Sequence, residues 1–308
     1  MLQTLNRSVR RMGLSFSRFY TSTNNPTPSS SSSSSSQQPQ EKTHFGFKTV
    51  NKEDKEDMVK EVFDSVSSKY DLMNDVMSMG IHRLWKDELM NTLNPTPGSH
   101  LLDVAGGTGD VSFRFLDRIK NSPNYFPNIA SSSTLKSSSL PSSATVYDIN
   151  QSMLNEGKKR GLTMGYTDLS DPSIDWVQGN SENLPFKDET FNCYTVSFGI
   201  RNCTNIDQVL REAHRVLKKG GRFLCLEFTQ VPNPLLRYAY DTYSFNVIPV
   251  MGQLITGDHD SYKYLVESIR QFPNQDKFAQ MITDAGFKQV TYKNLTFGVV
   301  AIHSGFKL

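Results

Sequence analysis

The sequence predicts an α/β fold in which a mostly parallel sheet is flanked by helices. Three observations lead to this prediction. A strand-like stretch at residues 100–104 runs into a glycine-rich turn and then a helix, apolar strand patterns alternate with amphipathic helix patterns as far as residue 228, and two closely spaced strands close the chain. Counting these gives seven strands, with an antiparallel strand at the C-terminal end.

The glycine-rich turn is the first element that suggests a ligand. Gly106, Gly107 and Gly109 allow positive φ and let a ligand approach bare main chain at the start of a helix predicted from about Thr108. A dinucleotide site requires G-x-G-x-x-G, but Ser112 stands where the third glycine belongs. Asp103 at the strand end instead suits S-adenosylmethionine, whose sulfonium and amino groups are cationic. An ordinary glycine-rich βα turn is the alternative.

The N-terminal residues have the composition of a targeting segment. Residues 1–40 contain four arginines (Arg7, Arg10, Arg11 and Arg18) and no acidic residue, and apolar residues lie between the arginines. This composition is typical of a mitochondrial transit peptide, with a basic tail as the alternative. A Ser/Thr/Pro/Gln linker follows, so residues 1–43 are assigned to leader and linker and residues 44–308 to one folded domain.

Charge and residue usage exclude several other classes. Subtracting the four leader arginines takes the formal net charge from +2 to −2, which removes the usual support for nucleic-acid binding. The histidines and the three cysteines show no metal-binding spacing, so we expect no metal and buried free thiols. No apolar run reaches the roughly 20 residues that span a bilayer.

Two helices are predicted between Lys52 and Asn91, before the first strand of the main sheet, where they could form an N-terminal lid over a pocket. The segment between them, residues 68–80, is dense in Met, Asn and Asp. It and the start of the second helix contain Tyr70, Asp71, Asn74, Asp75 and His82. These polar residues favour a site, and plain helical packing is the alternative.

Polar residues follow the carboxyl ends of the next strands, where ligands bind in doubly wound sheets. Asp148 ends the second strand (144–148) and is placed to accept the ribose hydroxyls of a nucleoside, unless it caps the next helix. A low-complexity insertion at residues 121–143 explains its distance from the glycine turn. Asn180 and Ser181 follow the third strand (174–178), and Arg201 and Asn202 follow the fourth (191–198).

The last third of the domain predicts a helix at 205–218, a strand at 222–228, helices at 262–271 and 275–285, and the closing strands at 289–296 and 298–303. Between them, residues 234–257 are too polar to cross a membrane and more aromatic than a surface connection requires. This segment suits a groove for a hydrophobic substrate or a contact with a membrane face, with core packing as the alternative.

Several sequence blocks together resemble the ubiquinone/menaquinone biosynthesis C-methyltransferase family across residues 45–308. The blocks cover residues 70–86, 103–110, 180–186, 197–202, 226–228 and 261–269. The resemblance implies a class I Rossmann-like S-adenosylmethionine-dependent methyltransferase fold, and the leader favours the ubiquinone branch. The expected reaction is then methylation of a ring carbon of a methoxy-polyprenyl-benzoquinol. The serine-rich stretch at residues 131–143 departs from the family pattern.

The resemblance also implies site residues and partners. S-adenosyl-L-methionine is the expected cofactor, and the residues expected to bind it are Thr108, Asp148, Asn180, Ser181 and Ser197, with Gly106 and Gly107 of the turn. The expected partners are the polyprenyl benzoquinol, other subunits of a ubiquinone-synthesis complex and the matrix face of the mitochondrial inner membrane, to which the chain would attach peripherally. A homodimer is left open.

Methyl transfer to a ring carbon needs an acceptor activated as the quinolate, held in line with the methyl group, with water excluded. We predict that Arg201 stabilises this negative charge or orients a water that takes the proton, because an arginine is too basic to act as the base itself. Asn202, Tyr70 and Asp75 are predicted to orient the quinol or the water. The alternatives are a demethylmenaquinone C-methyltransferase, an O-methyltransferase of the same pathway, and a non-catalytic scaffold subunit of the complex.

Overall fold

The seven strands of the main sheet lie in the order β5-β4-β3-β6-β7-β9-β8 in a computed structural model that describes residues 41–66, 70–125 and 141–308. All neighbours from β5 to β7 are parallel, and β9 is antiparallel to both β7 and β8. This is the predicted arrangement. The strands are β3 (His100–Val104), β4 (Ser143–Asp148), β5 (Ser173–Gln178), β6 (Phe191–Ser197), β7 (Leu217–Phe228), β8 (Lys288–Leu295) and β9 (Val300–Phe306).

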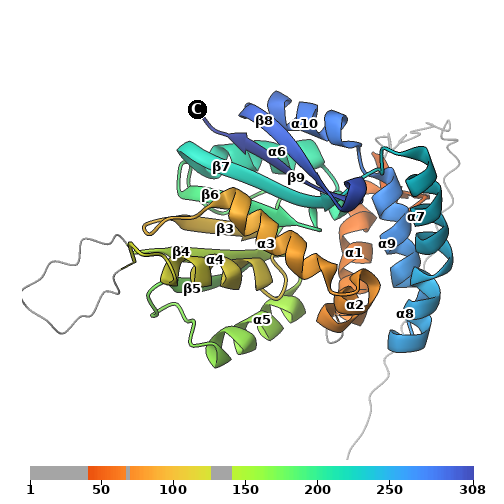
Figure 1. Cartoon of the computed structure of the whole chain (residues 1–308), viewed down its shortest axis with the longest axis horizontal. Helices are drawn as coiled ribbons and strands as arrows, with labels where there is room; N and C mark the ends of the chain where they lie inside the picture. Colours follow the sequence, from red (N-terminus) through yellow and green to blue (C-terminus); the bar gives the residue numbers. More distant parts are fainter. Residues whose placement is uncertain (1–40, 67–69, 126–140) are drawn as a thin grey trace, which may run out of the picture. The chain divides into compact units, whose positions relative to one another are not determined.

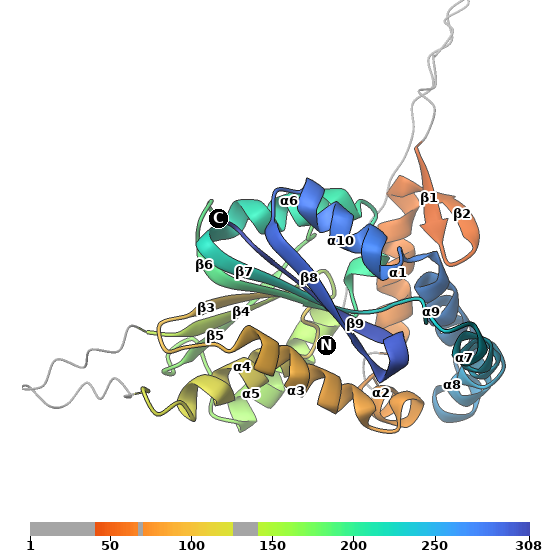
Figure 2. The same ribbon diagram turned by 45° about the horizontal axis from the view of Figure 1, so that its top comes forward.

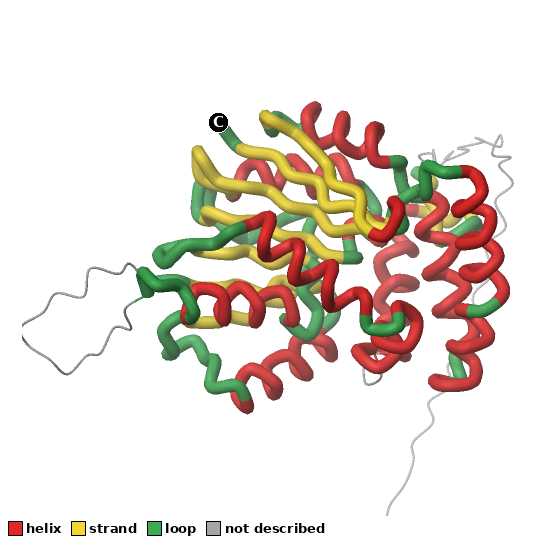
Figure 3. Tube along the Cα trace, in the orientation of Figure 1, coloured by secondary structure: helices red, strands yellow, loops and turns green. Residues whose placement is uncertain are grey.

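Helices cover both faces of this sheet, as Figures 1 and 3 show. Alternate residues of one strand face opposite sides, so Leu101 packs in one apolar cluster and Leu102 in another. The helices α3 (Ile81–Leu93), α4 (Asp110–Lys120) and α5 (Gln151–Thr163) contribute to the first cluster. The helices α6 (Ile206–Val216) and α10 (Gln275–Asp284) contribute to the second.

A further group of helices lies at the end of the sheet where the parallel strands finish (Figures 1 and 2). It consists of α1 (Lys52–Val66), α2 (Tyr70–Ser78), α7 (Pro234–Asn246), α8 (Ile248–Thr256) and α9 (His259–Gln271). The chain segments before β3 and after β7 therefore meet over the strand ends. Their contact includes a small apolar cluster built on Ile248, Tyr262 and Val266, against which Met77 of α2 packs.

Three sequence predictions differ from the structure, and most of a fourth falls outside the described residues. The segment predicted as a connection before residue 80 forms a helix of its own, α2, which makes three helices in place of two. The helix predicted at residues 205–218 ends at Val216, because Leu217 already pairs with Phe191 and begins β7. The expected start of the fold at His44 falls inside an unpredicted hairpin of β1 (Lys42–Phe45) and β2 (Lys48–Asn51). Residues 126–140 of the expected insertion lie outside the described residues.

The hairpin attaches to α9. The Phe45 ring stacks on Tyr264 with centroids 4.1 Å apart, and the Phe47 backbone N–H donates to Glu267 at 3.1 Å. Gly46 at the turn has φ +57, and a Cβ there would lie 2.3 Å from a Glu267 carboxylate oxygen. The positive φ and the close approach of Glu267 therefore favour a glycine at this turn.

Candidate active site

The glycine turn between β3 and α4 folds as the sequence predicts, although α4 begins at Asp110 and not at Thr108. Gly107 and Gly109 have φ +54 and +78, and a Cβ on Gly109 would lie 2.6 Å from the Trp176 ring. Under the turn, both oxygens of the buried Asp103 accept hydrogen bonds, from the Thr195 hydroxyl at 2.8 Å and from the Ser112 hydroxyl at 2.9 Å. Burial raises the pKa of Asp103 to about 6.

One cavity lies over the ends of β4, β5 and β6, and we call it the nucleoside cavity. Its lining includes Gly107, Asp148, Asn180, Ser181, Ser197 and Asn202, with Val59 and Phe63 contributed by α1. Five of the seven predicted cofactor residues are thus brought together in one place. The part of the N-terminal region that covers them is α1, in agreement with the predicted lid.

Asp148 is the acidic group of the nucleoside cavity. Its Oδ2 accepts from the Gly107 backbone N–H at 2.9 Å and its Oδ1 from the Asn150 backbone N–H at 2.8 Å. The cap of α5 is the Asn150 side chain, which accepts from Met153 N, so the helix-cap alternative for Asp148 is wrong. Each carboxylate oxygen keeps one lone pair, so together the two oxygens can accept from two ribose hydroxyls. Burial raises the pKa of Asp148 to about 6, although the backbone hydrogen bonds oppose the shift.

The loop after β5 closes the same cavity. The Asn180 amide donates to Glu56 of α1 at 2.7 Å, while its oxygen accepts from the Glu182 backbone N–H. The Ser181 hydroxyl lies 3.3 Å from the Cys203 sulfur. Burial raises the pKa of this half-buried thiol to about 11, which keeps it protonated.

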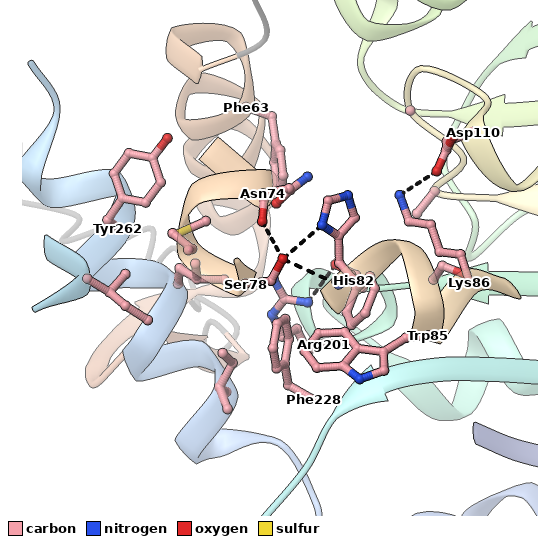
Figure 4. Close-up of a pocket in the computed structure, with 18 of the residues that line it drawn as sticks. Phe63, Asn74, Ser78, His82, Trp85, Lys86, Asp110, Arg201, Phe228 and Tyr262 are labelled. Carbon is pink, nitrogen blue, oxygen red and sulfur yellow. Dashed lines mark hydrogen bonds and ion pairs between the residues drawn. The ribbon is translucent and has the colours of Figure 1, made fainter. Parts of the chain in front are cut away.

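A second cavity adjoins the first, and we call it the aromatic cavity (Figure 4). Phe63, Ala105, Gly107, Ser197 and Phe198 line both. The other predicted cofactor residues, Gly106 and Thr108, line only the aromatic cavity. Its remaining walls come mainly from α2, α3 and α7–α9, and include Met77, Trp85, Phe228, Tyr240, Tyr243 and Tyr262.

The two cavities together fit an adenosine joined to an amino-acid chain. Asp148 supplies the ribose acceptor, and the bare Gly106–Gly107 backbone marks the passage between the cavities. The Ser197 hydroxyl is buried there without a hydrogen-bond partner among the described residues, so it can serve a ligand. No group of three or more metal-binding side chains occurs in residues 41–66, 70–125 and 141–308.

Arg201 lies in the wall of the aromatic cavity, as predicted. Its Nη1 donates to Glu227 at 2.8 Å and to the Phe198 carbonyl at 2.5 Å, and its Nε donates to the Ser268 hydroxyl at 3.3 Å. Burial raises the pKa of Glu227, although the Arg201 charge opposes the shift. Nη2 donates no hydrogen bond within the described part of the chain, so this nitrogen can meet a negative charge in the cavity.

The other predicted catalytic residues lie in three different environments. Asn202 lines the nucleoside cavity, and its Oδ1 accepts from the Tyr264 hydroxyl at 2.9 Å. Asp75 lines neither cavity. Its two oxygens accept from Arg83 Nε at 2.8 Å and from Arg83 Nη2 at 2.7 Å. Tyr70 begins α2, but its side chain lies outside the described residues.

Several lining residues were not assigned a role from the sequence. His82 contacts Ser78 in the aromatic cavity, and Lys86 donates to Asp110 at 2.9 Å beside the glycine turn (Figure 4). Burial would raise the pKa of Asp110, but Lys86, Arg114 and Arg160 together hold it below the usual range. The tyrosines of α7 and α9 complete this group, and Glu227 contacts the cavity only through its ion pair with the lining residue Arg201. The aromatic composition of residues 234–257 was the available signal for the α7 tyrosines.

Comparison with known proteins gives one consistent family. The family model for the ubiE/COQ5 methyltransferase family matches residues 48–307. A protein of Dictyostelium discoideum named mitochondrial 2-methoxy-6-polyprenyl-1,4-benzoquinol methylase is 79% identical over 314 residues, covering 100% of both chains. Proteins of the same name from Mus musculus and Homo sapiens are 55% and 54% identical over 280 residues, covering 86% of this chain and 84% of theirs.

Solved structures share the fold at low sequence identity. A SAM-dependent methyltransferase from Thermotoga maritima, described as a possible histamine N-methyltransferase, has a TM-score of 0.53 at 17% identity, covering 80% of this chain and 99% of its own. The [4+2]-cyclase SpnF has a TM-score of 0.53 at 13% identity, covering 81% and 94%. These likenesses show the fold that S-adenosylmethionine-dependent methyltransferases have, as predicted.

Proposed function

The chain belongs to the ubiE/COQ5 methyltransferase family, and from this premise we propose that it is the mitochondrial enzyme that methylates a ring carbon of 2-methoxy-6-polyprenyl-1,4-benzoquinol in ubiquinone biosynthesis. The observation that carries the proposal is the junction of the two cavities at Gly107, Ser197 and Phe198. S-adenosylmethionine supplies an electrophilic methyl group when bound. The nucleoside cavity holds its adenosine, and the aromatic cavity holds the acceptor.

The aromatic cavity suits a quinol. Trp85, Phe228 and Tyr240 present aromatic surface to a ring, and Tyr243 and Ile248 continue an apolar path along α7 and α8 toward a polyprenyl tail. Arg201 supplies positive charge where the quinolate develops, and the enclosing helices exclude water. Arg201 therefore acts as a residue that stabilises the anion.

The direct test is methyl transfer from labelled S-adenosylmethionine to a short-chain methoxy-benzoquinol under reducing conditions, using the chain from Lys42 onward. Label on a ring carbon, located by mass fragmentation, is expected. Label on oxygen would favour an O-methyltransferase. Faster methylation of a demethylmenaquinol than of the benzoquinol would favour the menaquinone branch. The Asp148→Ala variant is the control, because transfer should depend on the nucleoside cavity.

We also propose peripheral attachment to the matrix side of the mitochondrial inner membrane through the outer face of α7 and α8. This face exposes apolar side chains, and α8 has no charged residue. The exposed apolar residues are Leu235, Leu236, Tyr238, Phe245, Val247, Val250 and Leu254. They lie on the helices whose inner residues line the aromatic cavity, so an acceptor tail could pass between the membrane and the site. No helix among the described residues is long and apolar enough to span a bilayer.

Vesicle flotation tests this attachment. The full chain should float with cardiolipin-containing phosphatidylcholine vesicles, and Leu235→Ser/Leu254→Ser should reduce the floating fraction severalfold. The matched control is Leu162→Ser/Leu169→Ser, which removes two leucines in and beyond α5 that are 60% and 92% exposed, against 77% and 79% for Leu235 and Leu254. Equal losses in both variants would contradict the assignment of the α7–α8 face.

Finally, we propose that the enzyme works with the other subunits of a ubiquinone-synthesis complex. Sedimentation would test whether the chain also forms a homodimer.

A scaffold role without catalysis makes a different prediction. If the chain only held the complex together, Asp148→Ala would still support ubiquinone synthesis in cells lacking the wild-type protein. A catalytic subunit requires that it does not.

A further inference from the structure

His82 reaches the aromatic cavity from the first turn of α3. Its backbone and ring are tied to Ser78 at the end of α2: Nδ1 lies 2.8 Å from the Ser78 hydroxyl oxygen, and the His82 backbone N–H donates to the same oxygen at 3.3 Å. Ser78 in turn donates its hydroxyl proton to the Asn74 carbonyl at 2.6 Å. Figure 4 shows these interactions in the cavity that Arg201 and Trp85 also line.

This network assigns the histidine tautomer. A serine hydroxyl has one proton to donate, and here the Asn74 carbonyl takes it. The contact between Ser78 and His82 therefore requires Nδ1 to be the donor. In the neutral ring Nε2 then carries the lone pair and can accept a proton.

Charged groups surround this nitrogen on several elements. The carboxylate of Asp75 on α2 lies 3.7 Å from Nε2, close enough to stabilise an imidazolium. Lys86 and Arg83 of α3 oppose the positive charge, while Asp110 at the start of α4 favours it. Burial first, and then Lys86, lower the pKa of His82 below its ordinary value, so the ring is a neutral acceptor at physiological pH.

The charged side chains of the cavity other than His82, and the phenols of Tyr240 and Tyr264, do not suit this role. Both Asp103 oxygens already accept hydroxyl protons, and Asp110 is paired with Lys86. Arg201 is bound to Glu227 and is a donor only. Burial raises the pKa of Tyr240 to about 12 and also raises that of Tyr264, so these phenols stay protonated.

We propose that His82 Nε2 is the base that accepts the hydroxyl proton of the quinol during methyl transfer, an inference that rests on the proposed function. The quinol O–H bond breaks and its proton moves to Nε2. The ring carbon then bonds to the methyl group as the bond from methyl to sulfur breaks, and that electron pair stays on sulfur. The ring C–H proton leaves to solvent, the imidazolium returns its proton to the quinol oxygen, and one proton is released overall.

In this arrangement Asp75 is a positioning residue. The sequence suggested that Asp75 orients the quinol or a water. In this arrangement it instead faces the imidazolium that proton transfer creates. Arg201, which lines the same cavity, supplies the positive charge for the oxygen anion. The two roles are separate, because one group removes the proton and the other stabilises the charge left behind.

The test compares His82→Asn and His82→Gln with the wild type in the methyl-transfer assay. Asparagine keeps a donor near the Nδ1 position for Ser78 and deletes Nε2. The matched control is His100→Gln, because His100 also contacts a serine hydroxyl at 2.8 Å and burial also lowers its pKa, but it lies at the start of β3 outside both cavities. Calorimetry of S-adenosylmethionine binding to each variant tests whether its nucleoside cavity is intact.

We expect a fall in kcat of about 10²–10⁴-fold in both His82 variants, with cofactor affinity unchanged and His100→Gln equal to the wild type. The wild-type kcat should rise with pH through a value below 6.5, and the variants should lose this limb. With a fluorinated, more acidic quinol the loss should shrink at least tenfold, because the acceptor ionises without help.

Two results would overturn the assignment while leaving the proposed function intact. One is a kcat of the His82 variants within threefold of the wild type. The other is an equal loss for both quinols together with weakened cofactor binding, which would show that His82 only supports the structure. Absence of transfer by the wild type to any quinol would reject the proposed function and this inference with it.

Discussion

Arg201 and Glu227 form a buried ion pair 2.8 Å long in the wall of the aromatic cavity, with side chains only 5% and 0% exposed. Glu227 Oε2 has no hydrogen-bond partner within the described residues. Two charges 26 residues apart in the sequence are therefore held together at the wall of the aromatic cavity. Removing one partner leaves the other as an uncompensated buried charge.

Arg201→Met is expected to lower the free energy of unfolding by about 3–5 kcal/mol and to lower turnover far more than cofactor affinity. Urea unfolding, calorimetry and the transfer assay measure the three effects. The double variant Arg201→Met/Glu227→Leu separates them. It should regain most of the lost stability but not the turnover, and recovery of turnover in the double variant would reject a direct role for Arg201.

Cofactor affinity should depend on the ionisation of Asp148. Burial raises the pKa of this carboxyl to about 6 in the free protein, so below pH 6 the protonated form dominates and loses its preference for hydroxyl donors. We expect the Kd for S-adenosylmethionine to increase as pH falls from 7 to 5. Asp148→Asn should weaken binding about tenfold to a hundredfold at pH 7.5.

The matched comparison is the pH dependence of Asp148→Asn itself. Burial also raises the pKa of Asp103 to about 6, but both its oxygens are engaged by Thr195 and Ser112. If Asp148 is the responsive group, its Asn variant should bind weakly with little change between pH 5 and 7. A pH dependence as steep as that of the wild type would assign the effect to Asp103.

Much of the sheet could be predicted because its local signals agree with its tertiary environment. The strand at 100–104, the glycine turn and the helix after it combine a buried apolar run with turn chemistry and helical spacing. The errors occur where tertiary pairing overrides local pattern. Residues 217 and 218 were predicted as the end of the helix at 205–218, yet Leu217 pairs with Phe191 and so belongs to β7. The nine residues of α2 are too few to show a clear period.

The site divides in the same way. Asp148 and Ser197 end strands and Asn180 follows one, and parallel strands bring their ends together, so the topology agrees with the grouping that strand order and the family resemblance predicted. Asp75 and His82 are seven positions apart on two helices, and only the α2–α3 corner decides that His82 faces the cavity while Asp75 pairs with Arg83. Glu227 contributes to the site through its ion pair with Arg201, and no local sequence pattern reveals that pair.

Gly109 should be far less replaceable than Gly80. Both residues cap the start of a helix in the left-handed region, with φ 78 and 75. A Cβ on Gly80 would meet nothing within 4 Å, whereas on Gly109 it would lie 2.6 Å from the Trp176 ring. Gly80→Ala should lower the free energy of unfolding by about 1–2 kcal/mol. Gly109→Ala should lower it by about 1–3 kcal/mol more and weaken cofactor binding. Equal destabilisation by Gly80→Ala and Gly109→Ala would show that the Trp176 ring can move away from the new Cβ at no cost in stability.

Asn202 should influence turnover through Tyr264 and not by contact with the quinol. The Tyr264 hydroxyl donates to Asn202 Oδ1 at 2.9 Å, both residues are buried, and Tyr264 lines the aromatic cavity. Tyr264→Phe leaves the Asn202 oxygen without its donor and should cost about 1–3 kcal/mol of stability. Asn202→Leu leaves the phenol unpaired in the same way. A double-mutant cycle on kcat/KM should then be strongly non-additive, with the double variant no worse than the poorer single one. Additive losses would mean that Asn202 meets the substrate independently, as the sequence alone suggested.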